Sequence, residues 1–135
     1  MKPKLRHATF ALDCPDALAL ANFYSVLLDL EVEPLYDFPP EDVTWIELVN
    51  PEGPTLGFQK IENYTAPTWP EGPVAQQIHL DLHVADLDEA EKHALECGAR
   101  KAQFQPGETF RVFLDPVGHP FCFVKNLERV GESNE

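Results

Sequence analysis

The chain runs through one order of elements twice within 135 residues. Each half has a strand of alternating polarity, an aspartate able to cap a helix, an amphipathic helix, and two strands joined by a Pro-Gly turn. The aspartates are Asp16 and Asp86, and the turns lie at residues 50–53 and 115–118. This order predicts two β-α-β-β-β modules, about residues 5–62 and 76–126. A chain of this length buries one core, so we expect a single domain over residues 5–126.

Local patterns place the elements of each half. Helices are predicted after Asp16, ending near Asp29, and after Asp86, ending at Gly98. Their expected buried stripes are Leu20, Phe23, Tyr24, Leu27 and Leu28 in the first and Leu87, Ala90, Ala94 and Leu95 in the second. Strands are predicted over residues 6–12, 31–37, 44–49, 55–61, 78–84, 100–104, 110–114 and 120–124.

Charge and composition exclude several function classes. The formal net charge is -13 with only 10 Lys and Arg residues, so a surface that tracks nucleic-acid phosphates or an anionic membrane is not expected. The chain has no apolar run of about 18 residues and no signal-peptide core, so we expect a cytoplasmic protein. The three cysteines show no C-x-x-C spacing and are expected to be reduced thiols. The polar residues 127–135 are expected to form a frayed tail.

Three stretches carry a family resemblance. They are residues 12–16 with Phe23 and Tyr24, residues 67–70 leading to 77–82, and residues 110–118 followed by 120–122. In these the chain resembles the vicinal oxygen chelate superfamily, which includes glyoxalase I, bleomycin-resistance proteins and extradiol dioxygenases, and most of all its small glyoxalase-like single-domain members. The resemblance implies an α+β fold in which two βαβββ modules form a curved, partly open, antiparallel-rich sheet with the helices outside. It also implies a homodimer.

The resemblance further implies where a metal would bind. Superfamily members that do chemistry hold a divalent ion with one side chain from the first strand and a Glu or Gln from the last strand of each half. Counting from the capping aspartates, the first-strand positions are Thr9 and His79. The last-strand position of the second half is Cys122. That of the first half is Gly57 or, if two residues are inserted after the turn, Gln59. Because the carboxylates that hard divalent ions prefer are missing, we expect no metal cofactor; a divalent metal at His79 is the alternative.

His79 and Cys122 each have a second interpretation. His79 is either a surviving ligand or base, or a neutral hydrogen-bonding histidine that lines a pocket, and the second is favoured. His79 and Asp81 also have the spacing of two ligands of a facial triad, but His83 lies about 13 Å along the strand and His119 lies in a turn. Cys122 is either a reactive thiolate or, as favoured, an inert buried thiol.

Aromatic residues of the second half and of the connection before it suggest a binding site. Trp69, Phe104, Phe113 and Tyr64 could form an aromatic wall, and Arg111 could hold an acidic group of a ligand, although ordinary packing explains each residue singly. Three function classes follow: a metal-independent protein that binds a small aromatic or apolar molecule, a metal-dependent lyase, isomerase or dioxygenase that uses His79, and a degenerate module for dimerisation or regulation. We favour the first. Its predicted ligand-binding residues are His79, Cys122, Gln59, Thr9, Trp69, Phe104 and Arg111.

Overall fold

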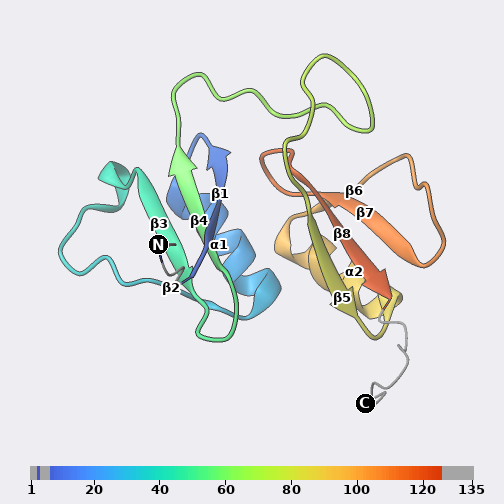
Figure 1. Cartoon of the computed structure of the whole chain (residues 1–135), viewed down its shortest axis with the longest axis horizontal. Coiled ribbons are helices and arrows are strands. Elements are labelled where there is room, and N and C mark those ends of the chain that lie inside the picture. Colours follow the sequence, from blue (N-terminus) through green and yellow to red (C-terminus); the bar gives the residue numbers. More distant parts are fainter. Residues whose placement is uncertain (1–2, 4–6, 126–135) are drawn as a thin grey trace. The chain divides into compact units, whose positions relative to one another are not determined.

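The structure, a computed structural model, describes Pro3 and residues 7–125. The chain divides into two compact units, one ending at Thr65 and the other beginning at Ala66 (Figure 1). Each unit contains one predicted module. The predicted tail over residues 127–135 and the predicted domain ends at residues 5 and 126 lie outside the described residues.

The first unit has the predicted β-α-β-β-β order with one added short 3-10 helix, Pro40–Asp42. Its elements are β1 Thr9–Cys14, α1 Ala17–Leu28, β2 Glu31–Val32, β3 Trp45–Val49 and β4 Thr55–Lys60. The strands form one sheet in the order β1-β4-β3-β2. β1 pairs with β4 in parallel, and the other pairs are antiparallel.

The second unit repeats this topology. Its elements are β5 Leu80–Val84, α2 Leu87–Cys97, β6 Arg100–Lys101, β7 Phe110–Leu114 and β8 Pro120–Lys125. The sheet order is β5-β8-β7-β6, with β5 parallel to β8 and the remaining pairs antiparallel. The predicted α+β class is therefore confirmed, and both sheets are mixed because the first and last strands of each unit run in parallel.

The helices begin and end at the predicted residues. The Asp16 carboxylate accepts the Ala19 N–H at 3.1 Å, and the Asp86 carboxylate accepts those of Asp88 and Glu89. These bonds satisfy amide groups that would otherwise lack partners in the first turn. α1 ends at Asp29 with φ 56°, and α2 ends at Gly98 with φ 109°, both left-handed.

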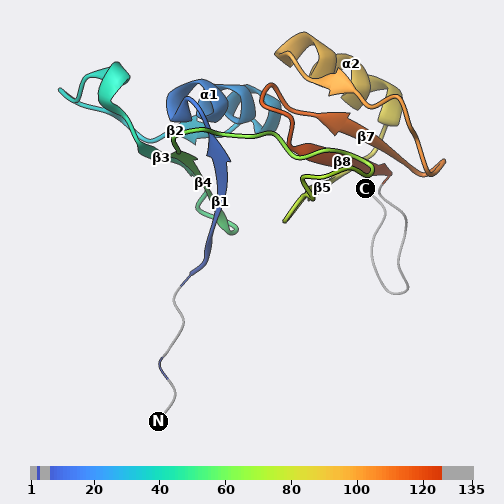
Figure 2. The ribbon, with the colours of Figure 1, turned by 90° about the horizontal axis from the view of Figure 1, so that it is seen from above.

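Each helix covers one face of its own sheet (Figure 2). α1 buries a broad apolar stripe in which Tyr24 stacks on Phe58 of β4, with ring centroids 5.6 Å apart. α2 buries much less: of its residues, all of which are described, only Ala94 is buried. The prediction that Leu95 lies in the buried stripe is wrong, because it is 46% exposed. Leu95 directly follows Ala94, so it lies about 100° around the helix from the buried line.

Several strand boundaries differ from the prediction. β1 is shifted toward the C-terminus and includes Asp13 and Cys14, which pair with Gln59 and Lys60 of β4. β2 ends at Val32 and β6 ends at Lys101, both shorter than predicted. β2 is followed by Pro34, which has no N–H to donate to a neighbouring strand. After β6, the side chain of Gln105 makes hydrogen bonds to the backbone of Ala102 and Val112 in place of a further strand pair. In the part of the chain that the structure describes, no helix has the length and apolar character needed to cross a membrane.

Candidate functional site

Strand register shows which residues of the two units are equivalent. Ala11 pairs with Gly57, and Asp81 pairs with Cys122. Ala11 and Asp81 each lie five residues before the aspartate that caps the following helix. Gly57 is therefore the counterpart of Cys122. Gln59 pairs with Asp13 and so corresponds to Val124, two residues beyond the last-strand metal position. The choice between Gly57 and Gln59 is thereby resolved in favour of Gly57.

We call the face of each sheet opposite its helix the open face. In the first unit Phe58 packs under α1, so the flanking residues Gly57 and Gln59 point to the open face. A Cβ atom at Gly57 would lie 2.6 Å from Cζ2 of Trp45 and 3.3 Å from Cγ2 of Thr9. The Trp45 indole thus occupies the space that a side chain at this position needs. Its Nε1 donates to Glu47 Oε2 at 2.9 Å, which fixes the ring.

Trp45 was not among the predicted site residues. The aromatic ring covers a glycine on the neighbouring strand, an arrangement known to compensate for the missing glycine side chain. Only the strand register, which pairs Trp45 with Gln59 and Glu47 with Gly57, brings these residues together. In the sequence, the only indication of this contact was an aromatic residue and a glycine on two adjacent predicted strands.

In the second unit the structure brings together His79, Asp81 and Cys122. His79 Nε2 lies 3.3 Å from Asp81 Oδ1, and both side chains are about half exposed. Burial, followed by the charge of Asp81 and a hydrogen bond to it, raises the pKa of the buried Cys122 thiol from 9.0 to about 11. Cys122 is therefore a protonated thiol at neutral pH. Such a thiol is a poor nucleophile, because the thiolate is the reactive form.

These residues do not fit a hard divalent ion. The four positions provide a hydroxyl at Thr9, no side chain at Gly57, an imidazole that faces Asp81 at His79, and a neutral thiol at Cys122. Across Pro3 and residues 7–125, no three His, Cys, Asp or Glu residues are grouped as metal ligands would be. His119 lies in the turn before β8, where its N–H donates to Asp115 Oδ1 at 2.9 Å.

Trp69 and Phe104 lie side by side in the second unit. Their ring centroids are 5.9 Å apart and the rings are tilted by 41°. Trp69 also packs on the small buried cluster of Ala102, Val112 and Cys122. Next to the two rings is a cavity of about 630 Å³, lined by Trp69, Pro70, Arg100, Lys101, Ala102, Gln103, Phe104 and Leu114. We call it the aromatic cavity.

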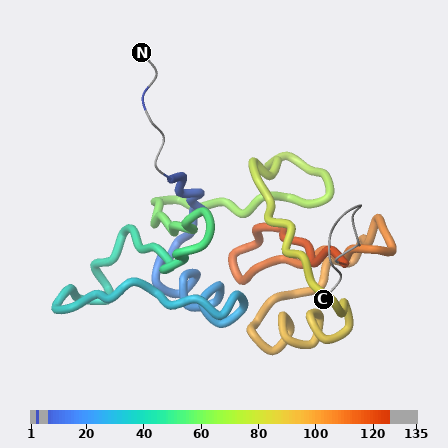
Figure 3. Tube along the Cα trace, turned by 60° about the horizontal axis from the view of Figure 1, so that its bottom comes forward, coloured from blue at the N-terminus to red at the C-terminus, as the bar shows by residue number. Residues whose placement is uncertain are grey.

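Both aromatic side chains come from loops that are held by hydrogen bonds. Residues 68–74 form a closed loop before β5 (Figure 3), in which Thr68 Oγ1 accepts the Val74 N–H and donates to its carbonyl oxygen. The Gln105 side chain donates to the carbonyls of Ala102 and Val112, each at 2.8 Å, and accepts the Val112 N–H. Gln105 thus continues the ladder between β6 and β7 and fixes the loop that carries Phe104.

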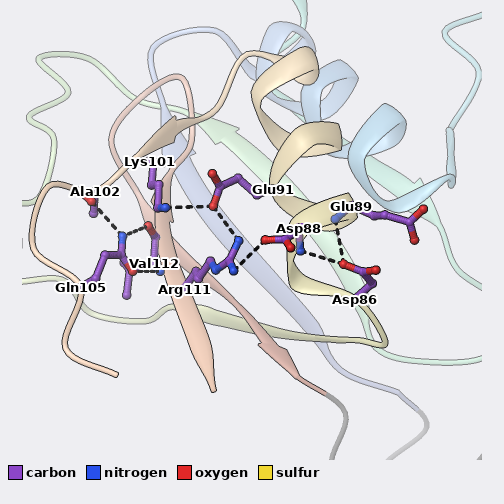
Figure 4. A network of polar contacts seen from close by, with 9 residues as sticks. All are labelled: Asp86, Asp88, Glu89, Glu91, Lys101, Ala102, Gln105, Arg111 and Val112. Carbon is purple, nitrogen blue, oxygen red and sulfur yellow. Dashed lines mark hydrogen bonds and ion pairs between the residues drawn. The ribbon is translucent and has the colours of Figure 1, made fainter. Parts of the chain in front are cut away.

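Arg111 and Phe113 lie on the other face, toward α2. Arg111 Nη2 lies 2.9 Å from Asp88 and Nη1 lies 3.0 Å from Glu91, which also pairs with Lys101 (Figure 4). The hydrogen bond to Asp88 contributes most to raising the pKa of Arg111. The guanidinium predicted to hold a ligand thus pairs with carboxylates of its own chain. Phe113 stacks on Phe121 in the core, so it does not join Trp69 and Phe104 in an aromatic wall.

Comparison with known proteins identifies the family. The glyoxalase-like domain family matches residues 9–124. A glyoxalase/bleomycin resistance protein/dioxygenase family enzyme from Burkholderia phytofirmans PsJN is 17% identical with a TM-score of 0.64, covering 89% of this chain and 98% of that one. A glyoxalase/dioxygenase from Nostoc punctiforme is 21% identical with a TM-score of 0.65, covering 91% and 92%.

A glyoxalase-related enzyme from Fulvimarina pelagi is 17% identical with a TM-score of 0.61, covering 90% of this chain and 88% of that one. No curated protein matches the chain. At these identities the solved structures show a shared fold, and the family match spans most of the chain. The chain belongs to the glyoxalase-like domain family of the vicinal oxygen chelate superfamily.

Proposed function

We propose that this protein binds a small aromatic or apolar molecule in the aromatic cavity, without a divalent metal. The observation that carries the proposal is the pairing of Trp69 and Phe104 beside a space of about 630 Å³. This volume lies within the range of roughly 300–1,000 Å³ that is usual for small-molecule sites. The cavity adjoins the cluster of Ala102, Val112 and Cys122 on the open face, because Trp69 and Ala102 belong to both.

The exposure of Phe104 supports the proposal. Its side chain is 53% exposed, although Gln105 next to it is anchored by three hydrogen bonds. A fixed loop that presents a large apolar ring to solvent gains stability when a ligand covers the ring. Full burial of a Phe side chain is worth about 1.5–3 kcal/mol, so a ligand that completes the burial gains part of this free energy.

Tryptophan fluorescence tests the proposal. In a Trp45→Phe background the protein emission comes from Trp69 alone, and titration with a non-fluorescent aromatic compound such as nitrobenzene should quench it with saturation beyond the quenching of free tryptophan, whereas polar aliphatic controls should not. Phe104→Ala should weaken this binding, whereas Phe38→Ala, which removes a similarly exposed ring (55%) from the first unit, should leave it unchanged. Equal binding by the Phe104→Ala variant and the Trp45→Phe parent would contradict the proposed site.

Metal analysis tests the competing function, a divalent-metal-dependent lyase, isomerase or dioxygenase. Elemental analysis of untagged protein should find no stoichiometric transition metal. A stoichiometric metal that His79→Ala abolishes would instead favour the metal-dependent enzyme, because His79 is the imidazole at the expected ligand positions.

Three further proposals rest on the sequence and the family. The two units act as a single domain over residues 5–126, the protein forms a homodimer, and it is located in the cytoplasm. Light scattering on a sizing column measures the mass in solution directly. A monomeric mass at all concentrations would rule out the dimer.

A further inference from the structure

We infer that the aromatic cavity takes an aromatic anion, a carboxylate attached to a ring, and that Arg100 binds the carboxylate. The inference rests on the proposed function, because it names the class of ligand that the same cavity would hold. It depends on where the side chains of β6 point and on which cations of the second unit already have partners.

The alternation along β6 places Arg100 on the open face of the sheet, and Arg100 lines the aromatic cavity. Lys101 pairs with Glu91 of α2 at 3.0 Å, so its side chain points to the helix face. Side chains on either side of it point the opposite way. Accordingly, Ala102 packs under Trp69, and Arg100 pairs in register with Leu114, which also lines the cavity.

Arg100 is a cation whose charge no described residue neutralises. Among the residues that the structure describes, Arg100 has no ion pair or hydrogen bond from its side chain, whereas Arg111 binds two carboxylates and Lys101 binds one. The described residues that line the cavity include no Asp or Glu. In a chain with a net charge of -13, a cavity where the described residues offer an arginine and no carboxylate is a specific place for an anion.

The chemistry of the lining selects the ligand. A guanidinium presents a planar fork of N–H groups that matches the two oxygens of a carboxylate. Trp69 and Phe104 offer ring faces and edges to an aromatic body. A ligand with a ring and an adjacent carboxylate can use both features at once, while a neutral aromatic molecule can use only the rings.

Two ring compounds that differ in charge test the inference. We would titrate 2-naphthoate and neutral 2-naphthalenemethanol into ¹⁵N-labelled protein and follow the indole N–H of Trp69, assigned with Trp45→Phe. Both compounds should shift this signal, with 2-naphthoate binding about tenfold more tightly, as expected for a hydrogen-bonded charge pair. Arg100→Gln should remove the preference, and Arg100→Lys should retain part of it.

Arg111→Gln is the matched control, because it makes the same substitution in the second unit but on the helix face, at a residue that does not line the aromatic cavity. It should leave the preference for 2-naphthoate unchanged. Equal affinity of the two compounds, or a preference that survives Arg100→Gln, would overturn the inference and leave the proposed function standing. If neither compound shifts the Trp69 indole signal, the proposed function fails and the inference fails with it.

Discussion

The two units share one topology but attach their helices by different means. In the first unit α1 buries six residues, including the rings of Phe23 and Tyr24, against the sheet. In the second unit α2 buries only Ala94, and its polar face is linked to the sheet by ion pairs from Arg111 and Lys101. The same βαβββ frame therefore tolerates both an apolar and a largely ionic contact between helix and sheet.

The open faces of the units differ as well. In the first, Trp45 lies over Gly57 and fills the position where the superfamily places a ligand residue. In the second, the same position holds Cys122, covered by Trp69 and hydrogen-bonded to Asp81, with the aromatic cavity alongside. The first open face is thus filled by an indole at this position, whereas the second has a cavity beside it.

The apolar docking of α1 predicts the largest effect. Tyr24→Ala should lower the free energy of unfolding by about 3–5 kcal/mol, because it removes a buried ring that stacks on Phe58 and leaves a cavity. Urea unfolding followed by circular dichroism measures this change. Leu95→Ala in α2 should change it by less than about 0.5 kcal/mol. Similar decreases in the free energy of unfolding for the two variants would contradict the difference between the two helices.

The contact between Trp45 and Gly57 predicts a smaller effect. Gly57→Ala should cost about 1–2 kcal/mol, because the new Cβ would force the indole to move. The displaced indole should also change its fluorescence. In a Trp45→Leu background, which removes the ring, Gly57→Ala should cost clearly less. The same cost in both backgrounds would show that the glycine is required for a reason other than the indole.

The ionic docking of α2 predicts an effect that depends on salt. Arg111→Gln should lower the free energy of unfolding by about 1 kcal/mol at low ionic strength, and by less in 1 M NaCl, because Asp88 is largely exposed and its charge is screened. Chemical unfolding at two salt concentrations measures both values. Arg100→Gln is the control on the opposite face and should have little effect on stability. A loss that does not change with salt would show that the arginine acts through packing.

The raised pKa of Cys122 predicts the smallest effect. The folded pKa of about 11 exceeds the ordinary value of 9.0, so the unfolded chain loses its proton first as pH rises. The contribution of the thiol to the free energy of unfolding is therefore complete below pH 9 and is lost as the pH rises from 9 to 11. By pH 9.5 the loss is less than about 1 kcal/mol. Urea unfolding of the unmutated protein at several pH values should show this decline in the free energy of unfolding, and the Cys122→Ala variant should lack it. Equal pH dependence in both proteins would assign the decline to other groups.

Sequence reasoning succeeded where neighbouring residues decide the structure. The caps at Asp16, Asp86 and Gly98 were predicted because each depends on hydrogen bonds or backbone angles within a few residues. It also placed Trp69 and Phe104 together as candidate site residues. The position of Arg111 on the helix face could not be predicted, since the alternation of a strand defines two faces without telling which one the helix covers.

The repeated βαβββ order, the ends of the helices and the family could all be predicted from the sequence, because they depend on local spacing and on motifs along the chain. Tertiary structure alone decided that Gly57 is the counterpart of Cys122, that Trp45 covers this glycine, and that Arg100 rather than Arg111 borders the aromatic cavity. The physical reason is that strand register and helix docking join residues far apart in the chain, and a shift of a single residue exchanges the two faces of a strand.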